Sequence, residues 1–268
     1  MTSGSRAKAQ RRAQAEQRSA ALAALEARRR RRRRRWGVAA VAVVLVAVAI
    51  GIGLAVSRGS GTTSPPTAGS PRLHLGSLAS LGTLQPAGSP GSPGPEGVPV
   101  PGGAALTGTA AGSAGSGGQP VDGITCQTNE QTLFHVHAHL TIFVGGVPSR
   151  VPYGIGIPGA QVSNTAEGPF VNAGNCFYWL HTHAEDGIIH IESPIERTFT
   201  LGDFFDIWGQ PLGPDRVGPA TGTVTALYDG RRYEGNPRDI PLEAHAQIQL
   251  EVGTPLVAPV SLARWNGL

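Results

Sequence analysis

The sequence predicts a mainly β fold: a compact β-sandwich or barrel-like domain with a short helix, preceded by one transmembrane helix and a disordered linker. Three observations carry this prediction. Residues 37–56 are apolar and uncharged, residues 58–119 are rich in Gly, Ser, Pro and Ala, and residues 120–268 repeatedly alternate apolar and polar side chains. Alternation with a period of two is typical of half-buried strands, so we expect the folded domain at residues 120–268.

The N-terminal segment, residues 1–35, is basic and ends in an unbroken arginine run from Arg28 to Arg35. Ala, Gln, Glu and Arg favour helix, but the segment offers no core, so we expect a fraying helix or a disordered tail. Arginines beside an apolar stretch contact anionic lipid headgroups on the cytoplasmic side of a membrane. The run therefore predicts a lipid contact and a cytoplasmic N-terminus.

Residues 37–57 are predicted to form one membrane-spanning helix. The twenty apolar residues 37–56 cover about 30 Å, the thickness of a bilayer's hydrocarbon core. Trp36 stands at the expected lipid–water boundary. A signal peptide cleaved near Ser57 is the alternative, although the apolar stretch is longer than usual for one. Both alternatives place the C-terminal domain outside the cytoplasm, and the anchored form is expected in the bacterial cell membrane.

The linker and the domain differ from the N-terminus in charge. Residues 58–119 cannot bury enough apolar surface to fold, so we expect a flexible tether with His74 as a bystander. After Gln119 the chain has seven arginines and no lysine, against about twice as many carboxylates. An acidic domain of this kind argues against nucleic acid as a partner.

The two cysteines, Cys126 and Cys176, both fall in the predicted domain. Outside the cytoplasm one disulfide between them is the default expectation, with free thiols or thiolate metal ligands as the alternative. The bond would link the entrance of the first strand to the strand that carries the second group of histidines.

Strands and one helix are expected in the following order. Alternation and turn residues predict strands at 134–144, 147–152, 177–183, 188–192, 224–233 (a hairpin) and 245–252. A short helix is predicted at 201–208, ended by Gly209 and Pro211. The strings HAHLTIFVG (137–145) and HAQIQLEVG (245–253) align without gaps, through related strands or through chance.

Histidines form two clusters in this domain, one in FHVHAHL and one in WLHTHAEDGIIH. Alternate positions of a strand point to one face, and histidine is the commonest metal ligand in proteins. We expect metal ligands among the clustered histidines and the histidine of the last strand, namely His135, His137, His139, His181, His183, His190 and His245. For His245, exposure on the strand surface is the alternative to a place in the site.

The hairpin register leaves two arrangements open. If Asp186 and Gly187 form a two-residue turn, His183 pairs with His190, whereas a loop at 184–187 pairs His181 with His190. Both registers gather three imidazoles on one face. The alternatives to metal binding are a polar face of hydrogen-bonded histidines and a pH sensor that works by collective protonation.

The expected metal is zinc or cupric ion, because all-imidazole surroundings suit these ions. Met1 is the only methionine and the cysteines are expected to be paired, which disfavours a soft sulfur site. Asp186 and Glu192 are expected to accept hydrogen bonds from imidazole N–H groups beside the metal. Glu185 and Glu243 are further candidates for ligands or for a general base.

A resemblance covers most of residues 124–253 and includes every clustered histidine. Bacterial membrane-anchored or secreted proteins with a His-rich domain are similar to this chain in the strings HVHAHLTIFV, CFYWLHTHAEDGIIHIESP, FTLGDFFDIWGQPL and RDIPLEAHAQIQLEVG. The resemblance implies an extracytoplasmic, cysteine-paired, His-rich domain. It implies no activity, because none is attached to that set.

Three classes of function remain. The first is a membrane-tethered module that captures or buffers zinc or copper outside the cell. The second is a metalloenzyme in which three histidines leave an open position for water or oxygen chemistry. The third is a structural or adhesive surface domain with incidental histidines. A closed shell of four ligands would favour capture, and three ligands opening on a pocket would favour catalysis.

Overall fold

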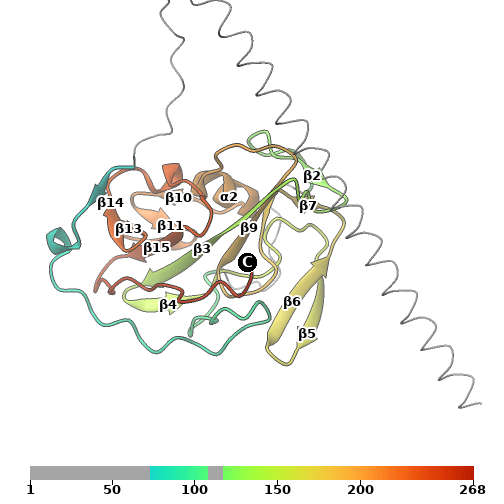
Figure 1. Cartoon of the computed structure of the whole chain (residues 1–268). Helices are drawn as coiled ribbons and strands as arrows, with labels where there is room; N and C mark the ends of the chain where they lie inside the picture. Colours follow the sequence, from blue (N-terminus) through green and yellow to red (C-terminus); the bar gives the residue numbers. More distant parts are fainter. Residues whose placement is uncertain (1–72, 108–116) are drawn as a thin grey trace, which may run out of the picture. The chain divides into compact units, whose positions relative to one another are not determined.

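The computed structural model describes residues 73–107 and 117–268, which form a mainly β domain with one short α-helix (Figure 1). The prediction of a mainly β domain with a short helix is confirmed. The predicted cytoplasmic tail, residues 1–35, and the predicted span, residues 37–57, lie outside the described residues. Within the described part of the chain, no helix has the length and apolar character needed to cross a membrane.

One large mixed sheet organises the domain, in the order β1-β14-β13-β15-β3-β9-β8, with β4 also paired to β3. Only β15 and β3 run parallel among these pairs. The sheet is open, with β1 and β8 at its two edges, so the barrel-like form that the sequence allowed is not found. Its strands are β1 (Leu75–Gly76), β3 (Phe134–Val144), β4 (Val147–Ser149), β8 (Leu180–His181), β9 (Ile188–Ser193), β13 (Val224–Tyr228), β14 (Arg231–Tyr233) and β15 (Gln247–Val252).

Three smaller sheets complete the β structure of the described residues. They comprise β2 (Cys126–Gln127) with β7 (Phe177–Tyr178), β5 (Gln161–Thr165) with β6 (Gly168–Ala173), and β10 (Leu212–Gly213) with β11 (Arg216–Val217) and β12 (Ala220–Thr221). The sequence did not reveal the β5–β6 hairpin because β5 is exposed along its whole length and lacks an apolar face. The predicted disulfide between Cys126 and Cys176 is confirmed, and it lies beside the β2–β7 pair.

Two predicted strands have different limits in the structure. The stretch 177–183 is divided into β7 and β8, and the Thr182 hydroxyl that follows donates to the carbonyl of Pro152. The last strand begins at Gln247 because His245 adopts a left-handed φ of 62°, which a strand cannot accommodate.

The helix α2 (Leu201–Trp208) has the predicted limits. Thr200 caps its first turn and exchanges hydrogen bonds with Asp203, while Gly209 ends the helix in the left-handed conformation with φ of 72°. The helix buries its aromatic residues against the sheet core, as expected. Two short 3-10 helices, η1 (Leu78–Leu81) and η2 (Pro237–Asp239), lie in the connections.

The apolar face of the large sheet contains the main core. It packs on the aromatic residues of α2 and is formed by alternate residues of the central strands: Ala138, Leu140, Ile142, Leu180, Ile189, Ile191, Ile248, Leu250 and Val252. Because successive strand residues point to opposite sides, the intervening positions form the other face. That second face carries the clustered histidines, and we call it the histidine face.

The gapless alignment of residues 137–145 with residues 245–253 has the same register as the pairing in the sheet. Gln247 pairs with His139, and Val252 pairs with Val144. The two similar strings therefore lie side by side as the parallel strands β3 and β15 at the centre of the sheet.

Residues 73–107 were expected to belong to a disordered linker, but in the structure they are bonded to the domain. We call them the N-terminal strap. Figure 1 shows the strap running along the outside of the domain. Its backbone is bonded to the domain at several points, including Leu106 N–H to the Arg150 carbonyl at 2.9 Å and Gln85 N–H to the Leu256 carbonyl at 2.8 Å. Val98 is fully buried. Hydrogen bonds to its neighbours therefore order a segment whose composition offers little apolar surface.

The C-terminal segment, residues 254–268, covers the β15 side of the histidine face. Alternate side chains of β15 bind its backbone: Gln247 accepts from Leu262 N–H at 2.5 Å, and Gln249 accepts from Val260 N–H at 2.8 Å. Glu251 accepts from Val257 N–H at 3.3 Å. The polar residues of β15 thus hold a covering segment and do not face open solvent.

Candidate metal centre

Three neighbouring strands bring one histidine each into a row across the histidine face. His137 of β3 pairs with His190 of β9, which in turn pairs with His181 of β8. Of the two hairpin registers that the sequence left open, the structure has the one that pairs His181 with His190. His135 lies two residues before His137 on the same side of β3, and His183 lies two residues after His181, just beyond the end of β8. Five imidazoles therefore converge.

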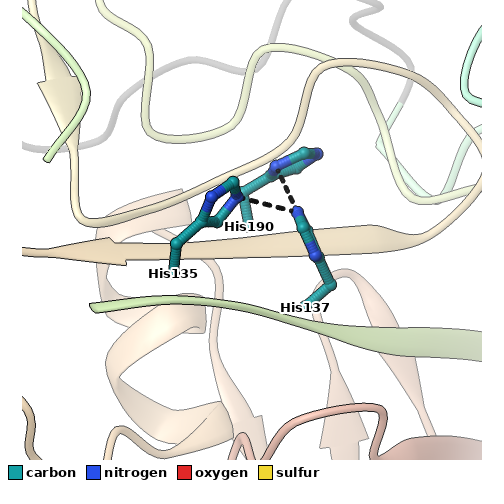
Figure 2. A group of neighbouring side chains, drawn as sticks. All are labelled: His135, His137 and His190. Atoms are coloured by element: carbon teal, nitrogen blue, oxygen red, sulfur yellow. Dashed lines mark hydrogen bonds between the residues drawn. The ribbon is translucent and has the colours of Figure 1, made fainter. Parts of the chain in front are cut away.

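The rings of His135, His137 and His190 point toward one another in Figure 2. His137 Nε2 lies 3.1 Å from His135 Nε2 and 3.1 Å from His190 Nδ1. The Glu192 carboxylate adds a fourth ligand atom, with Oε1 at 3.0 Å from His135 Nε2 and 3.6 Å from His190 Nδ1. These three histidines form one group whose nitrogens could hold a metal ion.

His181 and His183 present lone pairs to each other. The Nδ1 of His181 lies 2.8 Å from the Tyr178 carbonyl, and the Nδ1 of His183 bonds to the Val171 carbonyl. A carbonyl only accepts, so both rings carry their proton on Nδ1. The two Nε2 atoms are then unprotonated and only 3.2 Å apart. Together with His190, these two residues form a second group that could hold a metal ion.

The outer nitrogen of His190 is bonded to the N-terminal strap. Its Nε2 donates to Glu96 Oε1 at 2.7 Å, and both side chains are 7 % exposed. This bond leaves Nδ1 as the atom that faces His137. A carboxylate that orients a ligating imidazole in this way is a common support for metal centres.

The pKa values differ within the cluster. Burial, together with the nearby charge of His190, lowers the pKa of His137 to about 3, and burial lowers the pKa values of His181 and His183. Burial alone would also lower the pKa of His190, but hydrogen bonds and charges from Glu192 and Glu96 raise it to about 9. At neutral pH, His137, His181 and His183 are therefore neutral, as metal ligands must be, whereas His190 is protonated and would release a proton when it binds a metal.

Two carboxylates complete the group, which we call the histidine centre. Glu130 Oε1 lies 3.5 Å from His183 Nε2, and atoms of Glu130, His181 and Glu192 form a third group that could hold an ion. Glu192 is buried, whereas Glu130 and His135 are 36 % and 40 % exposed. The centre comprises His135, His137, His181, His183, His190, Glu130 and Glu192.

Neighbouring ligand atoms lie at distances close to the edge of a coordination tetrahedron. For metal–nitrogen bonds of about 2.0–2.1 Å, the edge of a regular tetrahedron is about 3.3–3.4 Å. The contacts from His135 through His137 and His190 to Glu192 measure 3.0 to 3.6 Å. The His181–His183 contact, at 3.2 Å, falls in the same range.

The other predicted site residues lie outside these groups. His139 is buried and donates to the Asp186 carbonyl at 2.9 Å, and it lines a cavity of about 310 Å³ between the strap and the C-terminal segment. His245 is exposed, stacks on Trp265 and bonds to the Leu268 carbonyl. Asp186 is fully buried, and burial with the nearby Glu96 charge raises its pKa to about 7.

Sequence reasoning missed two members of the site, Glu96 and Glu130. Glu96 is part of a Pro- and Gly-rich stretch, and Glu130 precedes β3 in a connection without periodicity. Neither position has a sequence pattern that marks it as part of a site. Glu96 reaches His190 only because the strap follows a long path across the domain. Glu192, predicted as a hydrogen-bond partner, is placed among the ligand atoms.

Comparison with family models, with curated proteins and with solved structures gives no match for this chain.

Proposed function

We propose that this protein is a single-pass, membrane-anchored extracytoplasmic protein that binds a divalent transition metal, zinc or cupric ion, for capture or buffering of the metal. The observation that carries the proposal is the pair of unprotonated nitrogens, His181 Nε2 and His183 Nε2, at 3.2 Å. Both ring protons are already bonded to backbone carbonyls. Two lone pairs at this distance repel each other unless a cation lies between them.

The support around the rings favours the same conclusion. Three buried histidines each have an outer nitrogen fixed by a carbonyl or a carboxylate. Such partners hold a ring in the orientation that ligation requires and increase its basicity. Hydrogen bonding within a polar face would instead pair donors with acceptors, which the His181–His183 contact does not do.

Zinc and cupric ion fit this donor set best. The described ligand atoms are imidazole nitrogens and carboxylate oxygens, and both cysteines are in the disulfide. Sites of this composition favour Zn²⁺ and Cu²⁺ over cuprous ion, which prefers sulfur ligands.

Capture is favoured over catalysis because the Glu192 carboxylate contacts two members of the group His135, His137 and His190 and could supply a fourth ligand. His135, His137, His190 and Glu192 would fill a tetrahedral shell, and three of the four side chains are buried. A metal-dependent enzyme is the second candidate, since the exposed edges of His135 and Glu130 give solvent a route to the centre.

Anchoring and localisation rest on the sequence. The uncharged stretch 37–56 and the arginines before it favour one span with the N-terminus inside. The disulfide is consistent with a domain outside the cytoplasm. Protease added to intact cells should digest the domain and spare the N-terminal tail, and complete protection of the domain would contradict this topology.

Metal uptake by the purified full chain tests the proposal. After incubation with Zn²⁺ or Cu²⁺ and desalting, elemental analysis should find at least one equivalent of metal. A variant that combines His135→Ala, His137→Ala, His181→Ala and His183→Ala should retain almost none. A matched variant with His74→Ala and His245→Ala, at two exposed histidines, should bind like the wild type.

Less than about a tenth of an equivalent in the wild type would overturn the proposal, since built metal sites bind far above that level. Equal uptake by the wild type and the quadruple variant would also overturn it. Circular dichroism of each variant separates loss of the site from loss of the fold.

A further inference from the structure

The histidine centre offers more ligands than one ion can use. This inference rests on the proposed metal binding. Five imidazoles and two carboxylates converge, whereas zinc in proteins takes four ligands, or five during reaction. A single ion would leave two or three of these seven ligands without a metal bond. The extra ligands call for an explanation, and their grouping in space supplies one.

The ligands divide naturally into two sets. His135 Nε2, His137 Nε2 and His190 Nδ1 follow one another at 3.1 Å. His181 Nε2 and His183 Nε2 form a separate contact at 3.2 Å, with Glu130 at 3.5 Å from His183. His190 occurs in both groups, but its Nε2 is bonded to Glu96. It can therefore give one nitrogen to one ion, and the first set contains its measured contact.

Glu192 lies between the two sets. One of its oxygens, Oε1, contacts His135 and His190 of the first set. Its carboxylate also belongs to the group with Glu130 and His181 of the second set. The other oxygen, Oε2, is buried and has no hydrogen-bond partner. A buried carboxylate oxygen without a partner needs a donor or a cation.

We propose that the histidine centre holds two divalent ions bridged by the Glu192 carboxylate. The first ion is bound by His135, His137 and His190 with Glu192 Oε1. The second ion is bound by His181, His183 and Glu130 with Glu192 Oε2.

This arrangement gives each ion four ligands and leaves no imidazole of the centre unused. It also provides a partner for Glu192 Oε2. The second ion explains why the Glu130 carboxylate approaches Glu192 across the histidines, since two like charges would otherwise repel each other. A carboxylate that bridges two ions is consistent with the ion separation of about 3.5–4 Å that is typical of two-metal sites.

Stoichiometry of the full chain tests the inference. Titration with Zn²⁺, followed by elemental analysis, should give two equivalents for the wild type. The His135→Ala/His137→Ala variant and the His181→Ala/His183→Ala variant should each retain one. Glu130→Gln should weaken only one of the two binding steps, and Glu167→Gln, at an exposed carboxylate, should weaken neither.

Electron paramagnetic resonance of the Cu²⁺-loaded chain gives a second readout. Two adjacent cupric ions should couple, which removes the ordinary signal of an isolated ion or adds a half-field line. Each double variant should restore the isolated-ion signal, which a purely structural effect of the substitutions would not do.

Saturation of the wild type at one equivalent, with both double variants at zero, would show a single shared ion and overturn the two-ion inference while leaving metal binding intact. Two equivalents that persist in either double variant would place an ion elsewhere and would also overturn it. Absence of uptake by the wild type would instead contradict the proposed function itself.

Discussion

The two faces of the large sheet differ in the interactions that their buried side chains make. On β9, Ile189 and Ile191 point into the core of the apolar face, while His190 and Glu192 point to the histidine face. All four side chains are buried. Burial stabilises the isoleucines directly, but it removes polar groups from water and is unfavourable for them unless they are paired.

The coverings of the two faces differ in the same way. The apolar face packs on α2, whereas the histidine face is covered by the strap and the C-terminal segment through backbone and carboxylate bonds. The comparison indicates that the apolar face supplies stability, whereas the histidine face gathers polar groups that could hold a metal ion. Local features that oppose stability are expected at functional sites.

The largest effect is expected on the apolar face. Ile191→Ala leaves a cavity in the core, because Ile191 is fully buried, and should reduce the free energy of unfolding by about 2–5 kcal/mol. Ile195→Ala is the matched control, since Ile195 is 50 % exposed. Chemical denaturation of the metal-free protein measures both. Equal losses for the two variants would contradict the assignment of the core to this face.

Metal should stabilise the protein through the histidine face alone. At a free metal concentration a hundred times Kd, each bound ion adds about 2.7 kcal/mol to the free energy of unfolding. Ile191→Ala should keep this gain. The variant without His135, His137, His181 and His183 should lose it. Denaturation with and without a chelator measures the difference, and a gain that survives in that variant would place the stabilising ion outside the centre.

The strap should matter for metal affinity. Glu96→Gln removes the negative charge that accepts the His190 Nε2–H bond, so metal should bind about 10- to 100-fold more weakly. Isothermal titration of the full chain measures the change, with Glu167→Gln as the control. A fragment that begins at residue 120 lacks Glu96 and should be weakened at least as much. Unchanged metal affinity in Glu96→Gln would show that the strap covers the histidine face without supporting metal binding.

The apolar face could be predicted from the sequence better than the histidine face. The strand β3 and the helix α2 have the predicted limits because their apolar periodicity and capping residues act locally. The parallel pairing of β15 with β3 could not be predicted, since register between distant strands depends on the whole fold. For the same reason, Glu96 and Glu130 were missed, and the sequence left open whether His245 joins the site or is exposed.

The smallest expected effect concerns pH. Glu251 is 1 % exposed, and burial raises its pKa from 4.5 to about 7, although bonds from Gln249 and Val257 act in the other direction. The folded state therefore binds more protons at Glu251 than the unfolded state does between these values, so the contribution of Glu251 to stability is greatest below pH 4.5 and is lost as pH rises through 7. From pH 6 to pH 8 the loss should be about 1 kcal/mol.

Glu251→Gln removes this titration and keeps an oxygen for the Val257 N–H, so from pH 6 to pH 8 the wild type should lose about 1 kcal/mol relative to the variant. Denaturation at pH 6, 7 and 8 in chelator isolates the effect from metal binding. Glu196→Gln, at an exposed carboxylate, should follow the wild type. The same pH dependence in Glu251→Gln and in the wild type would show that other groups cause the loss of stability.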